Sequence, residues 1–184
     1  MFIVEIALVV GTLLIGCSIV WSTYKCGISP MPSSREARNA MAELLADTGS
    51  GPVYELGSGW GGLAIGLAKK YPDRQIVGYE VSFFPWLVSV VVKRVLGLGN
   101  LVIYRRNFLL ADLSAADVFV CFLDTGNMRA ISHKLSAERA RDGFLISNFF
   151  ALPSFQADNV IKIDDLYTSP VYRYQLRRGI APTG

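Results

Sequence analysis

The chain has 184 residues and a formal net charge of +3, and hydrophobic residues make up 52% of it. The length fits one domain of ordinary size. The small charge, without a run of five like charges, gives no indication of a nucleic-acid partner. Three widely spaced cysteines and a single histidine, His133, indicate neither a metal site nor a disulfide framework, so we expect no metal and a reducing compartment.

Residues 2–24 form an apolar segment, and a helix of this length is long enough to span a bilayer, for which about 20 residues are needed. Glu5 is the only charged residue in it, and Trp21 and Tyr24 stand at its far end, where interfacial aromatics are found. Lys25 follows directly, whereas no Lys or Arg precedes the segment. The positive-inside rule therefore predicts an N-terminus outside the cell (inner) membrane and a cytoplasmic domain.

Other interpretations of this apolar segment fit the sequence less well. A cleaved signal peptide requires a basic region before its apolar core, which is missing here. Residues 14–17 resemble a lipoprotein cleavage box but also lack a basic flank. A buried core helix would have a polar face, and this segment has none. The sequence thus favours a membrane anchor at 1–24, a linker at 25–34 and one domain at 35–184.

Strand-like and helix-like segments alternate after the linker. Ser33 to Glu36 has the pattern of a capping box, which predicts a helix running to about Thr48. The expected strands are 53–56, 75–80, 101–105, 117–123, 143–148, 159–163 and 171–176, and the expected helices among them are 63–71, 85–96 and 128–139. This alternation predicts an α/β fold with a doubly wound, mostly parallel sheet of seven strands, closed by a pair that includes one antiparallel edge strand.

A glycine-rich turn at residues 57–62 joins the first of these strands to a helix. Glycine permits a sharp turn and a close ligand approach that a Cβ would block, and the helix directs free N–H groups at the ligand. The spacing fits the dinucleotide pattern GxGxxG, which is weak alone, and also E-x-G-x-G-x-G beginning at Glu55. The second pattern resembles motif I of the class I S-adenosylmethionine-dependent methyltransferases, and a carboxylate there repels a pyrophosphate but attracts sulfonium and ammonium groups, so we favour S-adenosylmethionine as the ligand.

Two acidic residues complete the pattern. Glu80 ends the second strand, 21 positions after Gly59, where a doubly wound nucleotide-binding fold places an acid that holds the ribose hydroxyls. Asp124 follows the fourth strand, next to the point where the strand order reverses. Asp124 is our candidate catalytic residue, which would orient or deprotonate an incoming amine, and a helix N-cap at this position is an equally good interpretation.

With these residues in place, the chain resembles the class I S-adenosylmethionine-dependent methyltransferases. It is most similar to their small membrane-anchored protein-lysine branch, typified by the mitochondrial enzyme that modifies the ATP synthase c subunit. The features shared with that branch are the N-terminal span, Pro30-x-Pro32-Ser33-Ser34, Glu55-Leu56-Gly57-Ser58-Gly59, Glu80, Trp86-Leu87-Val88 and Phe149-Phe150-Ala151-Leu152-Pro153. The resemblance covers nearly the whole chain and implies a Rossmann-like fold.

The resemblance also implies a set of cofactor-binding residues. These are Glu55, Gly57, Ser58, Gly59, Gly61, Glu80, Val81, Asn107 and Phe108. In this family an Asn at the position of Asn107 bonds the adenine amino group, and its neighbour, here Phe108, packs on the ring. Trp60 departs from the branch, which usually has Asp there, and this departure weakens any transfer of substrate identity.

The resemblance predicts transfer of a methyl group to a lysine amine of a membrane protein, with residues 2–24 in the lipid bilayer and no nucleic-acid or metal partner. A small-molecule or lipid methyltransferase would have the same cofactor residues. An NAD-dependent oxidoreductase fits GxGxxG and Glu80, but no separate substrate domain follows. A non-catalytic membrane scaffold that has lost cofactor binding is the alternative from another class.

Overall fold

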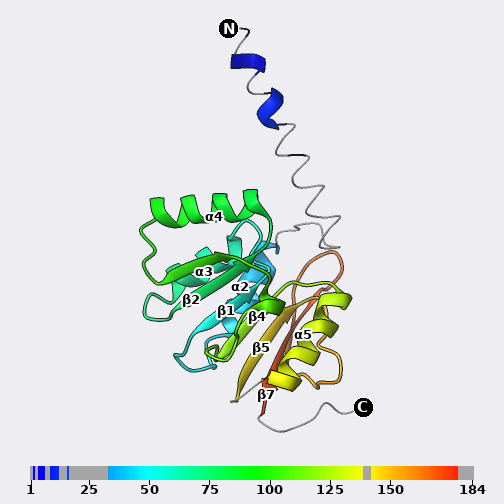
Figure 1. Cartoon of the computed structure of the whole chain (residues 1–184). Helices are drawn as coiled ribbons and strands as arrows, with labels where there is room; N and C mark the ends of the chain where they lie inside the picture. Colours follow the sequence, from blue (N-terminus) through cyan, green and yellow to red (C-terminus); the bar gives the residue numbers. More distant parts are fainter. Residues whose placement is uncertain are drawn as a thin grey trace.

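The computed structural model describes residues 2, 4–6, 9–12, 16, 33–138 and 142–177. The strands in this part of the chain are β1 (Val53–Leu56), β2 (Ile76–Glu80), β3 (Leu101–Arg105), β4 (Val118–Cys121), β5 (Gly143–Asn148), β6 (Asn159–Lys162) and β7 (Pro170–Leu176). The helices are α2 (Arg35–Leu44), α3 (Gly62–Lys70), α4 (Phe83–Val95) and α5 (Thr125–Glu138), with a short 3-10 turn η1 (Phe108–Leu110). Figure 1 shows how they surround one sheet.

The seven strands form one sheet in the order β3-β2-β1-β4-β5-β7-β6. The chain runs outward from β1 through β2 to β3 and then crosses back to β4, which pairs in parallel with β1. The strand order therefore reverses between β1 and β4, and the doubly wound sheet of seven strands expected from the sequence is confirmed.

The antiparallel strand does not lie where the sequence analysis put it. β7 pairs antiparallel with both β5 and β6, so β7 lies inside the sheet and β6 forms the edge. The connection between β6 and β7 covers only residues 163–169. So short a connection allows antiparallel pairing alone, because a parallel crossover needs a dozen residues or more.

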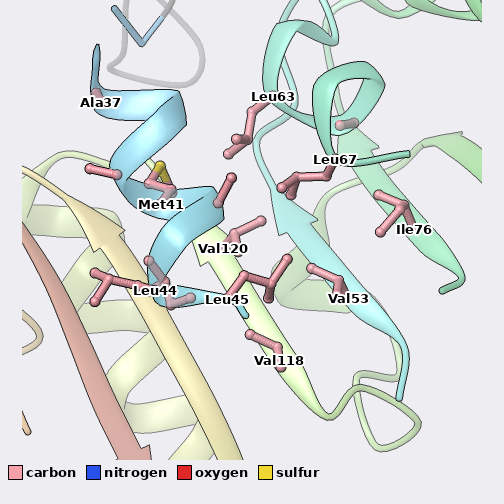
Figure 2. Close-up of a cluster of buried hydrophobic side chains, with 14 of the residues drawn as sticks. Ala37, Met41, Leu44, Leu45, Val53, Leu63, Leu67, Ile76, Val118 and Val120 are labelled. Carbon is pink, nitrogen blue, oxygen red and sulfur yellow. The ribbon is translucent and has the colours of Figure 1, made fainter. Parts of the chain in front are cut away.

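Each face of the sheet carries its own core. Alternate side chains of one strand point to opposite faces, so Val118 and Val120 pack against α2 and α3, whereas Phe119 and Cys121 pack against α5. Figure 2 shows the first of these cores, with Met41 of α2 and Leu45, the residue after α2, beside Val120. Burial on both faces explains why β4 is a continuous apolar run.

The helix starts differ from the expected ones by one to three residues, the most for α5, which begins at Thr125 and not at residue 128. The N-cap of α2 is Ser34, whose Oγ accepts a hydrogen bond from the Ala37 N–H at 3.0 Å, so the capping box expected at Ser33 is wrong by one residue. Helix α4 begins at Phe83, and Pro85 lies in its first turn, where the missing N–H of proline has no helical partner to lose.

The predicted membrane anchor at 1–24 and the linker at 25–34 lie for the greater part outside the described residues. Among the residues that are described, no helix combines the length and the apolar character that crossing a membrane requires. The anchor therefore stays a prediction of the sequence.

Candidate functional site

The carboxyl ends of β1, β2 and β4 meet at one edge of the sheet. The register aligns Leu56, the last residue of β1, with Tyr79 of β2 and Cys121 of β4. The turns that follow these strands carry the glycine loop (residues 57–62), Glu80 and Asp124. Ligands of open α/β sheets bind beyond the carboxyl ends of the strands where the strand order reverses, so this edge is the candidate site.

The backbone of the glycine loop is left-handed at three positions. Gly57, Gly59 and Gly61 have φ angles of +82°, +51° and +78°, a region that is costly for any residue with a Cβ. A Cβ on Gly61 would lie 2.7 Å from the Cβ of Ser89 in α4, whereas a Cβ on Gly59 would have no atom within 4 Å. Gly61 is thus required by backbone and packing together, and Gly59 borders the open space that a ligand needs.

Glu80 joins the glycine loop to the start of α4. One of its carboxylate oxygens accepts a hydrogen bond from the Gly59 N–H at 2.7 Å, and the other accepts one from the Ser82 N–H at 2.7 Å. The side chain is buried. Each carboxylate oxygen can accept a further hydrogen bond, so Glu80 fixes the loop and keeps acceptor capacity for a hydroxyl group.

Glu55, in the central strand β1, carries a buried carboxyl group close to the carboxyl end of the strand. Its Oε2 accepts a hydrogen bond from the Ala64 N–H at 3.1 Å, in the first turn of α3. Gly61 caps that helix without a side-chain hydrogen bond, so Glu55 supplies the missing acceptor. Burial raises the pKa of Glu55 well above its usual value, the hydrogen bond from Ala64 lowers it, and the charge of Glu80 raises it. A bound cation would favour the ionised form of this carboxyl group.

Ser58 is held by the protein itself. Its N–H and its Oγ both donate to the Tyr79 carbonyl oxygen, at 2.8 and 3.2 Å, and its carbonyl oxygen accepts from the Gly61 N–H at 2.8 Å. Gly78 makes room for it, since a Cβ there would lie 2.5 Å from the Ser58 Oγ. Ser58 therefore gives the loop its shape, and its predicted cofactor contact stays a prediction.

The residues predicted to surround the adenine ring differ in exposure. Val81 is 42% exposed directly after β2. Asn107 is exposed after β3, and its Oδ1 accepts from the Leu109 N–H at 2.9 Å, which caps η1. Phe108 is only 8% exposed and belongs to the core on the α5 face. Val81 and Asn107 thus offer surface to a ligand, while most of the Phe108 ring packs inside the domain.

Asp124 forms the N-terminal cap of α5. Its Oδ1 accepts hydrogen bonds from the N–H groups of Gly126 and Asn127 at 2.7 and 3.1 Å, and its Oδ2 accepts from the Asn127 side-chain amide at 2.7 Å. Partial burial raises the pKa of Asp124, but the hydrogen bonds from Asn127 and Gly126 outweigh it, so the pKa lies below its usual value. The capping interpretation is confirmed, and the carboxylate is a weak proton acceptor.

The structure adds Arg38, which the sequence analysis did not select. Its Nη1 lies 3.9 Å from the position a Cβ of Gly62 would take, at the start of α3. The same nitrogen donates to the carbonyl oxygen of Ser33. The described ranges 33–138 and 142–177 contain no carboxylate paired with Arg38. Nothing local in the sequence marks this residue, because its position depends on the packing of α2 against α3.

Asn148 is a second residue that the sequence analysis missed. It ends β5, it is 4% exposed, and its Oδ1 has no hydrogen-bond partner among the described residues. Its Nδ2 donates to the Ser33 Oγ at 3.5 Å. Ile146 faces the core beside α2 and α3, as Val53 does, so Asn148 and Glu55 point to the same face of the sheet. A polar residue ending a buried strand was the available signal.

The sheet order and the glycine loop define a class I methyltransferase fold, and solved structures agree. The chain is similar to an RNA methyltransferase from Salinibacter ruber in complex with S-adenosyl-L-homocysteine, with a TM-score of 0.74 over 83% of this chain and 98% of that one at 21% identity. It is also similar to a precorrin-6y C5,15-methyltransferase from Geobacter metallireducens, with a TM-score of 0.63 over 79% and 90% of the two chains at 10% identity. These similarities establish the fold.

The model of the ANTKMT methyltransferase domain matches residues 55–159, more than half of the chain, and the chain belongs to this family. A protein-lysine N-methyltransferase from Saccharolobus islandicus (strain REY15A) is 27% identical over 138 residues, which cover 73% of this chain and 84% of the relative. The protein is therefore a methyltransferase that uses S-adenosylmethionine. The dinucleotide-dependent oxidoreductase considered from GxGxxG is excluded.

Proposed function

We propose that this methyltransferase is a membrane-anchored protein-lysine N-methyltransferase whose substrate is a membrane protein. The observation that carries the lysine assignment is the similarity to the protein-lysine N-methyltransferase of S. islandicus over most of both chains. The membrane part of the proposal rests on the apolar segment at 2–24 and on the basic residues that begin at Lys25. Residues 1–24 form the anchor, 25–34 the linker and 35–184 the catalytic domain on the cytoplasmic side.

The chemistry of the candidate site fits S-adenosylmethionine. Gly59 leaves the loop backbone open to a ligand, and the buried Glu55 carboxyl group suits the cationic methionine end. A methionine also carries a carboxylate, and the guanidinium of Arg38 beside the start of α3, which pairs with no carboxylate among the described residues, suits that anion. Positive and negative protein groups thus match the opposite charges of the cofactor.

The other end of the cofactor would contact the turns after β2 and β3. Glu80 accepts hydrogen bonds from the ribose hydroxyls with the acceptor capacity that Gly59 and Ser82 leave free. The exposed side chain of Val81 packs on one side of the adenine ring, and Asn107 bonds its amino group. Phe108 contributes to this site indirectly, because its ring packs in the core on the α5 face and supports the turn after β3.

When bound, S-adenosylmethionine supplies a methyl group that is already activated by its sulfonium, so the protein needs to orient a neutral amine and exclude water. We assign the orientation to two acceptors at the ends of β4 and β5. The buried Oδ1 of Asn148 accepts a hydrogen bond from the amine, and the Asp124 carboxylate favours a positive charge nearby. Because the pKa of Asp124 lies below its usual value, its carboxylate orients the amine rather than deprotonating it, and the lysine enters the site as the neutral amine after giving its proton to bulk buffer.

The first test is isothermal titration of the full chain in detergent with S-adenosylhomocysteine, with Glu80→Ala as the variant. We expect binding in the micromolar range for the parent chain and a loss of roughly 100-fold for the variant, because two hydrogen bonds to a charged group contribute about 3 kcal/mol. Glu80→Gln keeps the shape of the side chain but replaces one of the two acceptor oxygens by an NH2 group, so comparison with Glu80→Ala separates loss of the carboxylate from loss of the whole side chain. Folded protein that binds no S-adenosylhomocysteine would support a non-catalytic scaffold instead.

The acceptor is tested separately with membranes of the source cell and S-adenosylmethionine labelled in its methyl group. We expect the label in a membrane protein, and we expect mass spectrometry to locate it on a lysine Nε. Label that extracts with lipid, or that stays in the small-molecule fraction, would contradict the protein-lysine assignment while leaving cofactor binding intact. The titration therefore tests cofactor binding, and the labelling experiment tests the acceptor, so one result can be negative while the other is positive.

A further inference from the structure

Helix α4 presents an apolar face that no described element covers. Figure 1 shows this helix along the upper margin of the domain, and it packs against β3, the edge strand of the sheet. The apolar residues exposed on it, here called the α4 face, are Phe83 (43%), Leu87 (37%), Val88 (40%), Val91 (52%) and Val95 (79%). So many large apolar side chains on one exposed helix face mark a site of interaction.

The exposure of the α4 face does not result from a loosely attached helix. Pro85 and Ser89 on the opposite side are buried, and the Trp86 Nε1–H donates to the Ile103 carbonyl oxygen at 3.0 Å. Leu87, Val88, Val91 and Val95 recur at the spacing of one helix face. The helix is therefore firmly seated and apolar on two sides, one toward the core and one toward its surroundings.

The charged side chains on α4 and along the chain from Val81 to Arg106 are all basic. No Asp or Glu occurs between Val81 and Arg106. Arg94 is exposed in the last turn of α4, and the Arg105 guanidinium lies 5.5 Å from the ring centre of Phe83 at the first turn. Basic groups at both ends of an apolar stripe are typical of helices that lie in the interface of an anionic membrane.

We propose that the α4 face lies on the surface of an anionic lipid bilayer, with its apolar side chains among the upper acyl chains and Arg94 and Arg105 at the headgroups. A second copy of the chain would bring these basic groups against each other, whereas anionic lipid neutralises them. This contact is additional to any membrane span and does not depend on the identity of the methylated substrate.

The contact would fix the orientation of the catalytic domain. Helix α4 leads from the carboxyl end of β2 back to the start of β3, so its axis runs antiparallel to these strands. A bilayer along α4 therefore lies along the strands, and the candidate site opens sideways at the membrane surface. A lysine presented close to the headgroup layer is then the accessible kind of acceptor.

The test uses the full chain reconstituted into vesicles of phosphatidylglycerol and phosphatidylcholine with brominated acyl chains, which quench tryptophan at short range. Val91→Trp carries the probe on the α4 face. Val160→Trp, at a site 44% exposed on the opposite edge strand β6, is the matched control. The signal of the parent chain, with its native tryptophans, is subtracted. We expect at least about twofold stronger quenching at position 91 than at position 160.

Removing the anionic lipid, or introducing Arg94→Glu with Arg105→Glu, should weaken the quenching, since each basic group near the surface shifts the equilibrium about fivefold. All variants should keep the parent affinity for S-adenosylhomocysteine, which verifies the fold. Equal quenching at the two positions overturns the proposal. A blue-shifted probe at position 91 without quenching also overturns it, because a second copy or the N-terminal segment of the chain then covers the face.

Discussion

The two halves of the candidate site are built differently. On the side of β1 and β2, the polar groups of the loop satisfy one another, as when Glu80 bonds Gly59 and Ser82. On the side of β4 and β5, Asp124 is committed to a helix cap while Asn148 keeps a buried oxygen without a partner among the described residues. A rigid, self-satisfied half suits a cofactor of fixed shape, and an unsatisfied half suits an acceptor that arrives with its own hydrogen-bond donor.

The largest effect is expected in the rigid half. Gly61→Ala forces a Cβ to within 2.7 Å of the Ser89 Cβ and imposes a residue with a Cβ at φ +78°. Strain and overpacking together should lower the free energy of unfolding by about 3 kcal/mol. Gly59→Ala, at φ +51° with open space around it, should cost only about 1 kcal/mol. Urea denaturation measures both, and equal losses would contradict a packing role for Gly61.

Substitution of Asn148, on the β4 and β5 side of the site, should lower the activity rather than the stability. Asn148→Leu removes a buried oxygen that has no partner among the described residues, together with the long hydrogen bond of 3.5 Å from its Nδ2 to the Ser33 Oγ, so the free energy of unfolding should change little. Methyl transfer should fall by about 10- to 100-fold, the value of a lost hydrogen bond of about 1.5–3 kcal/mol. Affinity for S-adenosylhomocysteine should remain within about twofold. Asn159→Leu on the exposed strand β6 is the control, and an equal loss of cofactor affinity and activity in Asn148→Leu would contradict the assignment.

The Glu55→Gln variant tests how far the buried carboxyl group of Glu55 lowers the stability of the chain when no ligand is bound. The folded-state pKa of Glu55 is raised, so the parent chain loses stability as the pH rises through that pKa, whereas Glu55→Gln does not. Above the folded-state pKa of Glu55, the free energy of unfolding of Glu55→Gln should exceed that of the parent chain by about 1.4 kcal/mol per unit of pKa shift. Below pH ~4 the two free energies of unfolding should converge. Its affinity for S-adenosylmethionine should be weaker. Urea denaturation across pH measures the effect, and a less stable variant at pH 8 would contradict it.

A small loss of stability is expected at Asp124. Asp124→Ala removes the acceptor for the Gly126 and Asn127 N–H groups and should cost about 1 kcal/mol, whereas Asp124→Asn, also a good cap, should cost a few tenths. If the carboxylate orients the amine, both variants should lose about tenfold in kcat. Activity retained in Asp124→Asn would show that Asp124 is a helix cap alone.

The glycine loop and its acids were predictable because their signal is local. A strand, a glycine turn and a helix fix the position of Glu55 and Gly59, and the length of one βαβ unit fixes the distance to Glu80. The roles of Ser58 and Phe108 were less predictable. Ser58 turned inward because Gly78 on the neighbouring strand leaves room for it, and Phe108 joined the core on the α5 face. Both outcomes depend on contacts with residues distant in the sequence.

The sequence by itself determined the alternation of strands and helices, the glycine loop and the acids at the strand ends, because periodicity and spacing are properties of neighbouring residues. Only the tertiary structure decided that β7 lies inside the sheet and that Arg38 reaches the start of α3. It also decided that Asn148 is buried without a partner for its oxygen among the described residues, and that the second apolar side of α4 stays uncovered by them. The physical reason is that burial and pairing depend on which surfaces meet, and elements far apart along the chain supply those surfaces.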